Sequence, residues 1–308
     1  MPDKPAAEVA IDSALIRSLL AGQAEALIPG AAALPLEKVA EGWDSEVWRL
    51  GDRHAVRLPR RALAAPLVLH EQLVLPGIAE RLARVGVRAP APVVAGVTAD
   101  GYPWPWSVVP WIEGERALDV PVAERSAWAV TLAKALGALH TPAPADHPVN
   151  PFRGVPLVAR DGAVTDRLAG LRDAGTLDPA SATLIQGVWR AGLSAAEWAR
   201  SPVWIHGDLH PGNLVARGAS LAGIIDFGDV TAGDPAYDLA VGWLAFDADG
   251  RERFVAATGS RYDAATWARA RAWAAAVALI LLAHSDDNPD YAALGRSAAE
   301  SVVGSPAG

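Results

Sequence analysis

Apolar residues change their spacing along the first third of the chain, and each change predicts a different element. In residues 7–28 they recur at helical spacing, which predicts an amphipathic helix. The short apolar runs 47–50 and 55–58 flank a Gly-Asp turn and predict a β-hairpin. Residues 62–84 return to helical spacing, and we expect Pro76-Gly77 to break that helix.

Beyond this helix the pattern predicts two more strands and then a mainly helical remainder. Strand-like runs at 92–97 and 106–111 flank a turn at 99–101, and the acidic Glu-Gly-Glu at 113–115 reads as a connector. The chain therefore divides into a mixed segment with a small antiparallel sheet, residues 1–110, and a mainly helical segment, residues 111–308. In the second segment we expect helices at 124–140, 165–172, 181–200 and from 235 onward, a loop-rich stretch at 144–162, and two short apolar segments at 214–216 and 222–225 joined by a turn.

Composition narrows the class of protein. The chain has 308 residues, no Cys and a formal charge of −8. The absence of Cys excludes disulfides and thiolate metal sites and fits a reducing compartment. Excess negative charge argues against a nucleic-acid surface. The first residues do not resemble a signal peptide, and the longest apolar run, 273–283, is too short to span a bilayer. We expect a cytoplasmic protein with no membrane or nucleic-acid partner, either a monomer or a small homo-oligomer.

Three oxygen-bearing side chains in neighbouring segments indicate phosphoryl transfer. Asp208 lies in His-Gly-Asp-Leu-His-Pro-Gly-Asn, which ends at Asn213, and Asp226 lies in Ile-Asp-Phe-Gly-Asp beyond the predicted hairpin. The reaction needs a group that orients the attacking hydroxyl and hard oxygen ligands that hold Mg²⁺ on the nucleotide phosphates. We assign the first role to Asp208 and the second to Asn213 and Asp226, because the hairpin can return the chain so that the three converge.

These two segments resemble the catalytic and metal-binding loops of the protein-kinase-like superfamily. The His-Gly-Asp form is similar to the aminoglycoside phosphotransferase family, and the resemblance covers nearly the whole chain. It implies an α+β, two-lobed protein-kinase-like fold, with a small mixed N-lobe that contains an antiparallel sheet and a larger, mainly helical C-lobe. It further implies transfer of the γ-phosphoryl group of ATP or GTP to a substrate hydroxyl, with Mg²⁺ as cofactor.

The resemblance also implies nucleotide-binding residues in the first lobe. Arg57 stands where the broader superfamily carries Lys, and Glu71 on the following helix is its expected ion-pair partner. Backbone amides around Ser45 occupy the place of the phosphate-covering loop. The stretch from Val109 to Trp111 is similar to the hinge that receives the base through its backbone groups.

Several other polar residues have structural interpretations. We expect Asp234 to cap the helix that follows it, and we read Asp238 as structural too. His140 and His206 are expected in core or loop-orienting roles. The arginines at 60–61 are expected to be solvated.

The acceptor is the least determined part of the hypothesis. An aminoglycoside-like, cationic acceptor fits the resemblance, and its ammonium groups would need acidic partners. Macrolide kinases of the same superfamily are similar but commonly have His at the position of Asn213. Kinases of metabolic alcohols, and a non-catalytic nucleotide-binding protein with this fold, remain alternatives, whereas a protein kinase would need a longer segment between Asp226 and Asp234. The candidate acidic partners are Glu113, Glu115, Asp247, Asp249 and the run 286–290.

Overall fold

The computed structural model describes residues 6–99, 101–285 and 288–304 and divides the chain into two compact units. The N-terminal unit comprises Pro2–Glu113 and Gly223–Gly228. The C-terminal unit comprises Gly114–Ala222 and Asp229–Gly308. The division falls three residues after the expected end of the first segment. It also places Gly223–Gly228 in the N-terminal unit, whereas the sequence analysis had assigned these residues to the helical lobe.

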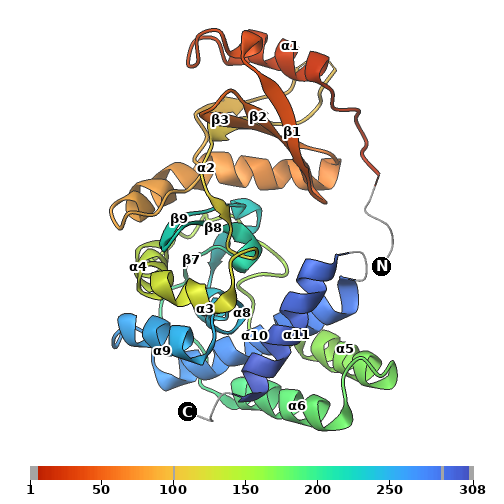
Figure 1. The fold of residues 1–308 in the computed structure, drawn as a ribbon, viewed down its shortest axis with the longest axis vertical. Coiled ribbons are helices and arrows are strands. Elements are labelled where there is room, and N and C mark those ends of the chain that lie inside the picture. The colour runs from red at the N-terminus through yellow and green to blue at the C-terminus, as the bar shows by residue number, and fades with distance from the viewer. Residues whose placement is uncertain (1–5, 100, 286–287, 305–308) are drawn as a thin grey trace. The chain divides into compact units, whose positions relative to one another are not determined.

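A five-stranded antiparallel sheet forms the centre of the N-terminal unit. Its strand order is β1-β2-β3-β5-β4, and the predicted hairpin is the pair β2 and β3. Helices α1 (Ser13–Gln23) and α2 (Ala65–Ala83) cover its two faces (Figure 1). The strands are β1 (Leu36–Glu41), β2 (Ser45–Leu50), β3 (His54–Pro59), β4 (Val94–Gly96) and β5 (Trp106–Pro110).

The core of this unit lies between α1 and the sheet. Asp12 caps α1 by accepting a hydrogen bond from the Leu15 amide at 2.8 Å, so the helix begins later than the apolar pattern suggested. Its buried side chains include Leu20, which packs in one cluster with Val56 and Trp106 from the sheet. The amphipathic pattern therefore predicted the helix and the face that it buries.

Two elements of this unit differ from the sequence prediction. Strand β1 was not predicted because its residues 37–41 are all exposed, so no alternation of buried and exposed positions marks it. Helix α2 runs through Pro76 without a break. Pro76 is exposed, so its missing N–H leaves one carbonyl of the preceding turn on the solvent side, where water can bind it.

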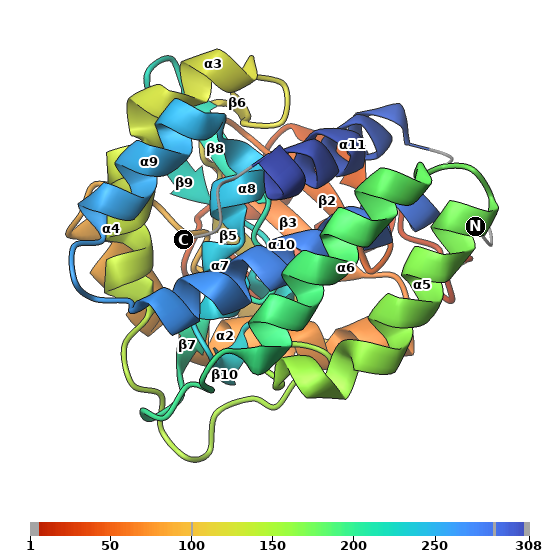
Figure 2. The ribbon, with the colours of Figure 1, turned by 90° about the horizontal axis from the view of Figure 1, so that it is seen from below.

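The C-terminal unit is built around a helical core. Figure 2 shows α10 running beside α6, α7 and α11. Loops of this unit connect the strands of two small sheets. One sheet pairs β7 with β10, and the other has the strand order β6-β8-β9. The helices are α3 (Val122–Arg125), α4 (Ala129–Leu139), α5 (Asp161–Asp173), α6 (Pro179–Ser194), α7 (Ala236–Leu239), α8 (Val241–Ala245), α9 (Ala248–Ala257), α10 (Ala264–His284) and α11 (Pro289–Gly304). The strands are β6 (Glu115–Arg116), β7 (Val203–Ile205), β8 (Leu214–Arg217), β9 (Ser220–Ile224) and β10 (Thr231–Gly233).

Two stretches, Ala62–Ala83 and Ala264–His284, are long and apolar enough to cross a membrane by length and composition alone. The second contains the apolar run that the sequence analysis considered too short. More than half of its most apolar window, 56%, is buried among other helices, as in the central helix of a globular protein. The first carries the buried Glu71. Both helices are thus elements of the folded units, and their apolar composition is weak evidence for a membrane.

Replacing the fully buried Leu20 with Ala should lower the free energy of unfolding by about 2–5 kcal/mol, because it leaves a cavity against the sheet. Leu27→Ala is the matched control, since that side chain is 61% exposed, and its effect should stay within about 0.5 kcal/mol. Urea denaturation of both variants measures the difference. Equal effects would mean that α1 does not form the core described.

Candidate active site

The loop that contains Asp208 and Asn213 connects β7 to β8 in the C-terminal unit. Strand β7 pairs with β10, with Ile205 opposite Thr231, so the loop starts from a fixed position. Gly207 has φ +84°, and a Cβ at this position would lie 2.4 Å from the Asp229 carbonyl oxygen. Only glycine fits here, which explains the residue between the His and the Asp of the motif.

The backbone of this loop is held from behind by the buried carboxylate of Asp238. One oxygen accepts the His206 amide at 2.7 Å and the other accepts the Gly207 amide at 3.1 Å. His140 Nε2 lies 3.1 Å from the same carboxylate, and the Asp238 side chain is fully buried. Asp238 therefore satisfies two backbone donors that would otherwise be buried without partners. Its structural interpretation, and the loop-orienting role expected for His140, agree with these contacts.

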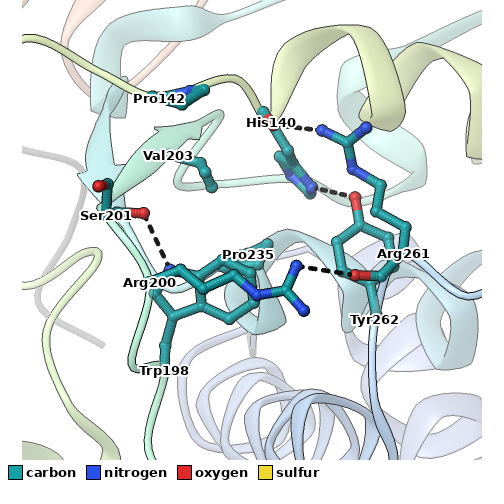
Figure 3. A pocket seen from close by; sticks show the side chains of 9 residues that line it. All are labelled: His140, Pro142, Trp198, Arg200, Ser201, Val203, Pro235, Arg261 and Tyr262. Carbon is teal, nitrogen blue, oxygen red and sulfur yellow. Dashed lines mark hydrogen bonds between the residues drawn. The ribbon is translucent and has the colours of Figure 1, made fainter.

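Tyr262 and Arg261 also contact His140. Its Nδ1 lies 2.7 Å from the Tyr262 hydroxyl, and Arg261 donates to the His140 carbonyl oxygen (Figure 3). These residues line a pocket of about 330 Å³, with Trp198 among its other walls. Burial raises the pKa of Tyr262 to about 12, so its hydroxyl stays protonated at neutral pH. The hydrogen-bond chain from Tyr262 through His140 to Asp238 is continuous.

Asp208 projects from this loop with 42% of its side chain exposed. Arg153 Nη2 lies 3.2 Å from Oδ1, and His210 Nε2 lies 3.6 Å from Oδ2. Burial disfavours the carboxylate, but the nearby His210 side chain and the positive charge of Arg153 outweigh it and hold the pKa of Asp208 below its usual value. The carboxylate is thus ionised and accessible, as a group that accepts a hydrogen bond from a substrate hydroxyl must be.

Arg153 is a site residue that the sequence analysis missed. Its Nε and Nη2 donate to Asp229 Oδ2 at 3.1 and 3.0 Å, and its Nη1 donates to the Tyr237 hydroxyl at 2.7 Å. The residue comes from the loop-rich stretch 144–162, which carries no periodic pattern, and it lies 55 positions before Asp208. The Asn-Pro-Phe-Arg-Gly segment is the sequence signal for a turn at Arg153. In this turn the Asn150 Oδ1 accepts hydrogen bonds from the backbone amides of Phe152 and Arg153.

Asn213 lies at the end of a short 3₁₀ turn, Pro211–Asn213, with its side chain buried. Its side-chain nitrogen Nδ2 donates to the Asp208 backbone carbonyl at 2.8 Å. This bond fixes the amide group and leaves the side-chain oxygen as the atom for a cation, which suits Mg²⁺. Asn213 therefore contacts the backbone of Asp208 within one loop, and the convergence of their side chains with Asp226 stays a prediction.

Arg57, Glu71 and Asp226 lie together in the N-terminal unit. Arg57 Nη1 donates to Glu71 Oε1 at 2.7 Å, which confirms the predicted ion pair, and Arg57 Nη2 donates to Asp226 Oδ1 at 2.6 Å, which was not predicted. Burial raises the pKa of Glu71 to about 7, and the charge of Arg57 opposes that rise. Asp226 has φ +62°, the one positive φ of a non-glycine residue in the described chain. Its Oδ1 accepts from Arg57, and its side chain is 53% exposed.

The loop before Ser45 is braced by two arginines that the sequence analysis expected to be solvated. Arg60 is only 5% exposed and pairs with Glu41 at 3.0 Å, while Arg61 pairs with Asp44 at 2.6 Å. The prediction that both arginines are solvated was wrong. Acidic residues at the two ends of this loop pair with them, and the sequence of the strand alone does not indicate these pairs. Ser45 begins β2 and is buried. The phosphate-binding role of its backbone stays a prediction.

The expected hinge lies at the end of β5. Val109 pairs with Ala55 of β3, and the Trp111 amide donates to the Arg53 carbonyl at 2.8 Å. The Trp111 ring faces the guanidinium of Arg49, whose central carbon is 4.7 Å from the ring centroid. The Trp111 amide is thus already engaged, which removes it as a free donor to a base. The roles of Val109 and of the Trp111 carbonyl stay predictions.

Three of the five described acidic residues proposed as partners of a cationic acceptor have structural partners. Glu113 pairs with Arg49 at 2.8 Å, Asp247 caps α9, and Asp290 lies 3.3 Å from Arg116. Asp234 accepts the Ala236 amide at 3.0 Å, but the N-cap of α7 is Pro235, so the predicted cap position was wrong by one residue. Residues 286 and 287 lie outside the described chain. Within the described ranges, no group of three or more His, Asp or Glu side chains is placed to hold a metal ion.

Replacing Asp238 with Ala should loosen the Asp208 loop, because two buried amides lose their acceptor at a cost of about 1–3 kcal/mol each. Amide hydrogen exchange of residues 203–209 should become faster. Asp178→Ala is the control, since this residue caps the exposed start of α6 and its loss should leave exchange in the loop unchanged. If exchange in the loop were the same in both variants, Asp238 would not hold it.

Comparison with known proteins agrees with this geometry. The model of the phosphotransferase enzyme family matches residues 35–273. A search of curated proteins gives no significant match. Among solved structures, the GDP complex of aminoglycoside 2'-phosphotransferase-IIIa has a TM-score of 0.66 at 19% identity, with 95% of this chain and 99% of that chain covered. The macrolide 2'-phosphotransferase MphH from Brachybacterium faecium gives 0.57 at 21% identity, with 92% and 99% covered. These likenesses show the fold, and the family match covers more than half of the sequence. The chain therefore belongs to the phosphotransferase enzyme family.

Proposed function

We propose that this enzyme transfers the γ-phosphoryl group of ATP or GTP to a hydroxyl of a small molecule, with Asp208 orienting the hydroxyl. The observation that carries the proposal is the state of Asp208, which is ionised, accessible and fixed by its loop next to Asn213. In the reaction a bond forms between the acceptor oxygen and the γ-phosphorus while the bond to the β–γ bridging oxygen breaks. The nucleoside diphosphate leaves, and the hydroxyl proton passes to Asp208 or to solvent.

The nucleotide phosphates would bind through Arg57 and the metal ion. Arg57 carries a positive charge between Glu71 and Asp226, and its hydrogen bond to Glu71 keeps its fork oriented. Asn213 and Asp226 would hold Mg²⁺ together with phosphate oxygens, and the ion would neutralise charge that develops on the transferred group. Convergence of these two ligands is part of the proposal.

For the acceptor we keep the aminoglycoside-like class as the first candidate. Several solved structures with this fold are aminoglycoside complexes, among them the GDP and kanamycin complex of APH(2")-IIIa at 18% identity. Macrolides and metabolic alcohols are the second candidates, supported by the similar macrolide phosphotransferases and by the structural partners that the acidic residues Glu113 and Asp247 already have. A cytoplasmic enzyme would have both nucleotides available.

A coupled assay of nucleoside diphosphate release tests the activity directly. Purified protein with Mg²⁺ and either ATP or GTP is screened against kanamycin, gentamicin, erythromycin, homoserine and choline. Acceptor-dependent release, with a phosphorylated product by mass spectrometry, supports the proposal. The non-catalytic alternative would be favoured if the protein bound nucleotide tightly but showed neither acceptor-dependent release of nucleoside diphosphate nor basal hydrolysis.

Asp208→Asn should lower kcat by about 10³-fold or more, because the neutral amide no longer accepts the hydroxyl proton or orients the hydroxyl as strongly. The dissociation constant of the nucleotide should stay within about twofold, since Asp208 is not a phosphate ligand. Stopped-flow or coupled kinetics together with calorimetry separate the two effects. Wild-type turnover in this variant would remove Asp208 from the role assigned to it.

Asp226→Ala should abolish the Mg²⁺ dependence of nucleotide binding and weaken the affinity in the presence of Mg²⁺ by about tenfold to a hundredfold. Without Mg²⁺, in EDTA, wild type and variant should bind with similar affinity. Titration calorimetry with and without the metal gives both values. An unchanged magnesium effect in the variant would exclude Asp226 as a metal ligand. The exposed Asp173→Ala on α5 serves as the charge-matched control.

A further inference from the structure

Arg153 reaches the catalytic loop from a segment that is itself anchored. The Thr231 hydroxyl donates to the Pro148 carbonyl at 2.7 Å, which attaches the start of the segment to β10. At its other end Gly154 has φ +68°, and a Cβ there would lie 2.7 Å from the Ala232 carbonyl oxygen. Residues 148–154, hereafter the arginine loop, are thus held against β10 at both ends although they contain no helix or strand.

The arginine loop presents one guanidinium to two carboxylates and a phenol. Asn150 Nδ2 donates to Asp229 Oδ1 at 2.7 Å, so the loop engages both oxygens of that carboxylate, one through Asn150 and one through Arg153. Nη1 of Arg153 donates to the Tyr237 hydroxyl, and its Nη2 donates to Asp208 Oδ1 as well as to Asp229. The Tyr237 hydroxyl stays protonated because burial raises its pKa, although the charge of Arg153 opposes the rise. All donors of this fork that face the site therefore have acceptors.

The two oxygens of Asp208 differ as a result. Oδ1 accepts a hydrogen bond from Arg153 at 3.2 Å, whereas His210 Nε2 lies 3.6 Å from Oδ2, beyond ordinary hydrogen-bond distance. Because the carboxylate is only partly buried, no packing contact alone would stop its rotation about the Cβ–Cγ bond. Arg153 donates to Asp229 through both Nε and Nη2. Because the guanidinium is planar, these two bonds fix the position of Nη2, which also binds Asp208 Oδ1.

We propose that Arg153 is a positioning residue for phosphoryl transfer, which holds Asp208 through Oδ1 so that Oδ2 is presented to the acceptor hydroxyl. The inference rests on the role proposed above for Asp208. It assigns to Arg153 no contact with the nucleotide, so its loss should act on the chemical step and not on nucleotide affinity. Misplacement of one catalytic group by about 1 Å can cost about a hundredfold in rate.

The test uses the full-length protein and steady-state hydrolysis of Mg²⁺-ATP and Mg²⁺-GTP, in which water takes the place of the acceptor. Arg153→Gln should lower kcat by about a hundredfold and leave the KM for nucleotide within about twofold. Arg153→Lys should recover part of the rate, because a point charge can reach Oδ1 but cannot bridge Asp229 and Tyr237 as well. Arg172→Gln is the matched control, since Arg172 is 52% exposed on α5 and pairs with the neighbouring Asp173 at 2.9 Å, and it should behave as wild type.

A second variant separates positioning from folding. Asp229→Asn keeps the shape of the anchor but weakens its hold on the guanidinium, so kcat should fall about tenfold, and the double variant with Arg153→Gln should be no slower than Arg153→Gln alone. Additive losses, or a wild-type kcat in Arg153→Gln, would overturn the proposal. So would a loss of rate that is matched by a loss of nucleotide affinity or of the melting temperature. Undiminished hydrolysis in Asp208→Asn would instead overturn the proposed function.

Discussion

A single buried carboxylate fixes the backbone from which the candidate catalytic side chains extend. Asp238 has no exposed surface, and its oxygens accept two consecutive amides of the loop that carries Asp208. A charge in such a place is stable only when every oxygen is hydrogen-bonded. Asp238 meets this condition through the loop amides and His140, so the loop conformation and the burial of the carboxylate depend on each other.

The arrangement extends outward from this point in two directions. Behind Asp238, the contacts of His140 with Tyr262 and Arg261 tie the end of α4 to the connection before α10. In front of it, the loop carries Asn213, whose amide bonds the Asp208 carbonyl, and Asp208, whose carboxylate meets Arg153. The Asp208 side chain is partly exposed and that of Asn213 is buried, and both belong to a loop whose backbone the buried Asp238 holds.

The sequence predicted the parts of this protein that local spacing encodes. The hairpin of β2 and β3, the amphipathic α1 and the motif residues Asp208 and Asn213 follow from short-range patterns, and the pair of Arg57 with Glu71 follows from the family resemblance and is confirmed. Convergence of Asp226 with Asp208 and Asn213 stays a prediction. The interactions that were missed join residues distant in sequence. Arg153 lies 55 positions from Asp208 in a segment without periodicity, and the buried state of Arg60 depends on Glu41, which lies on a strand with no buried pattern.

The N-terminal unit is discontinuous in sequence, since it takes Gly223–Gly228 from beyond the point where the chain has entered the C-terminal unit. A fragment cut after Glu113 would keep the whole five-stranded sheet but would lose Asp226. Arg57 would then retain Glu71 as its single carboxylate partner in the described part of the unit. The N-terminal unit is therefore not a separable module, and recombination between relatives at this boundary would join an arginine from one parent to an aspartate from the other.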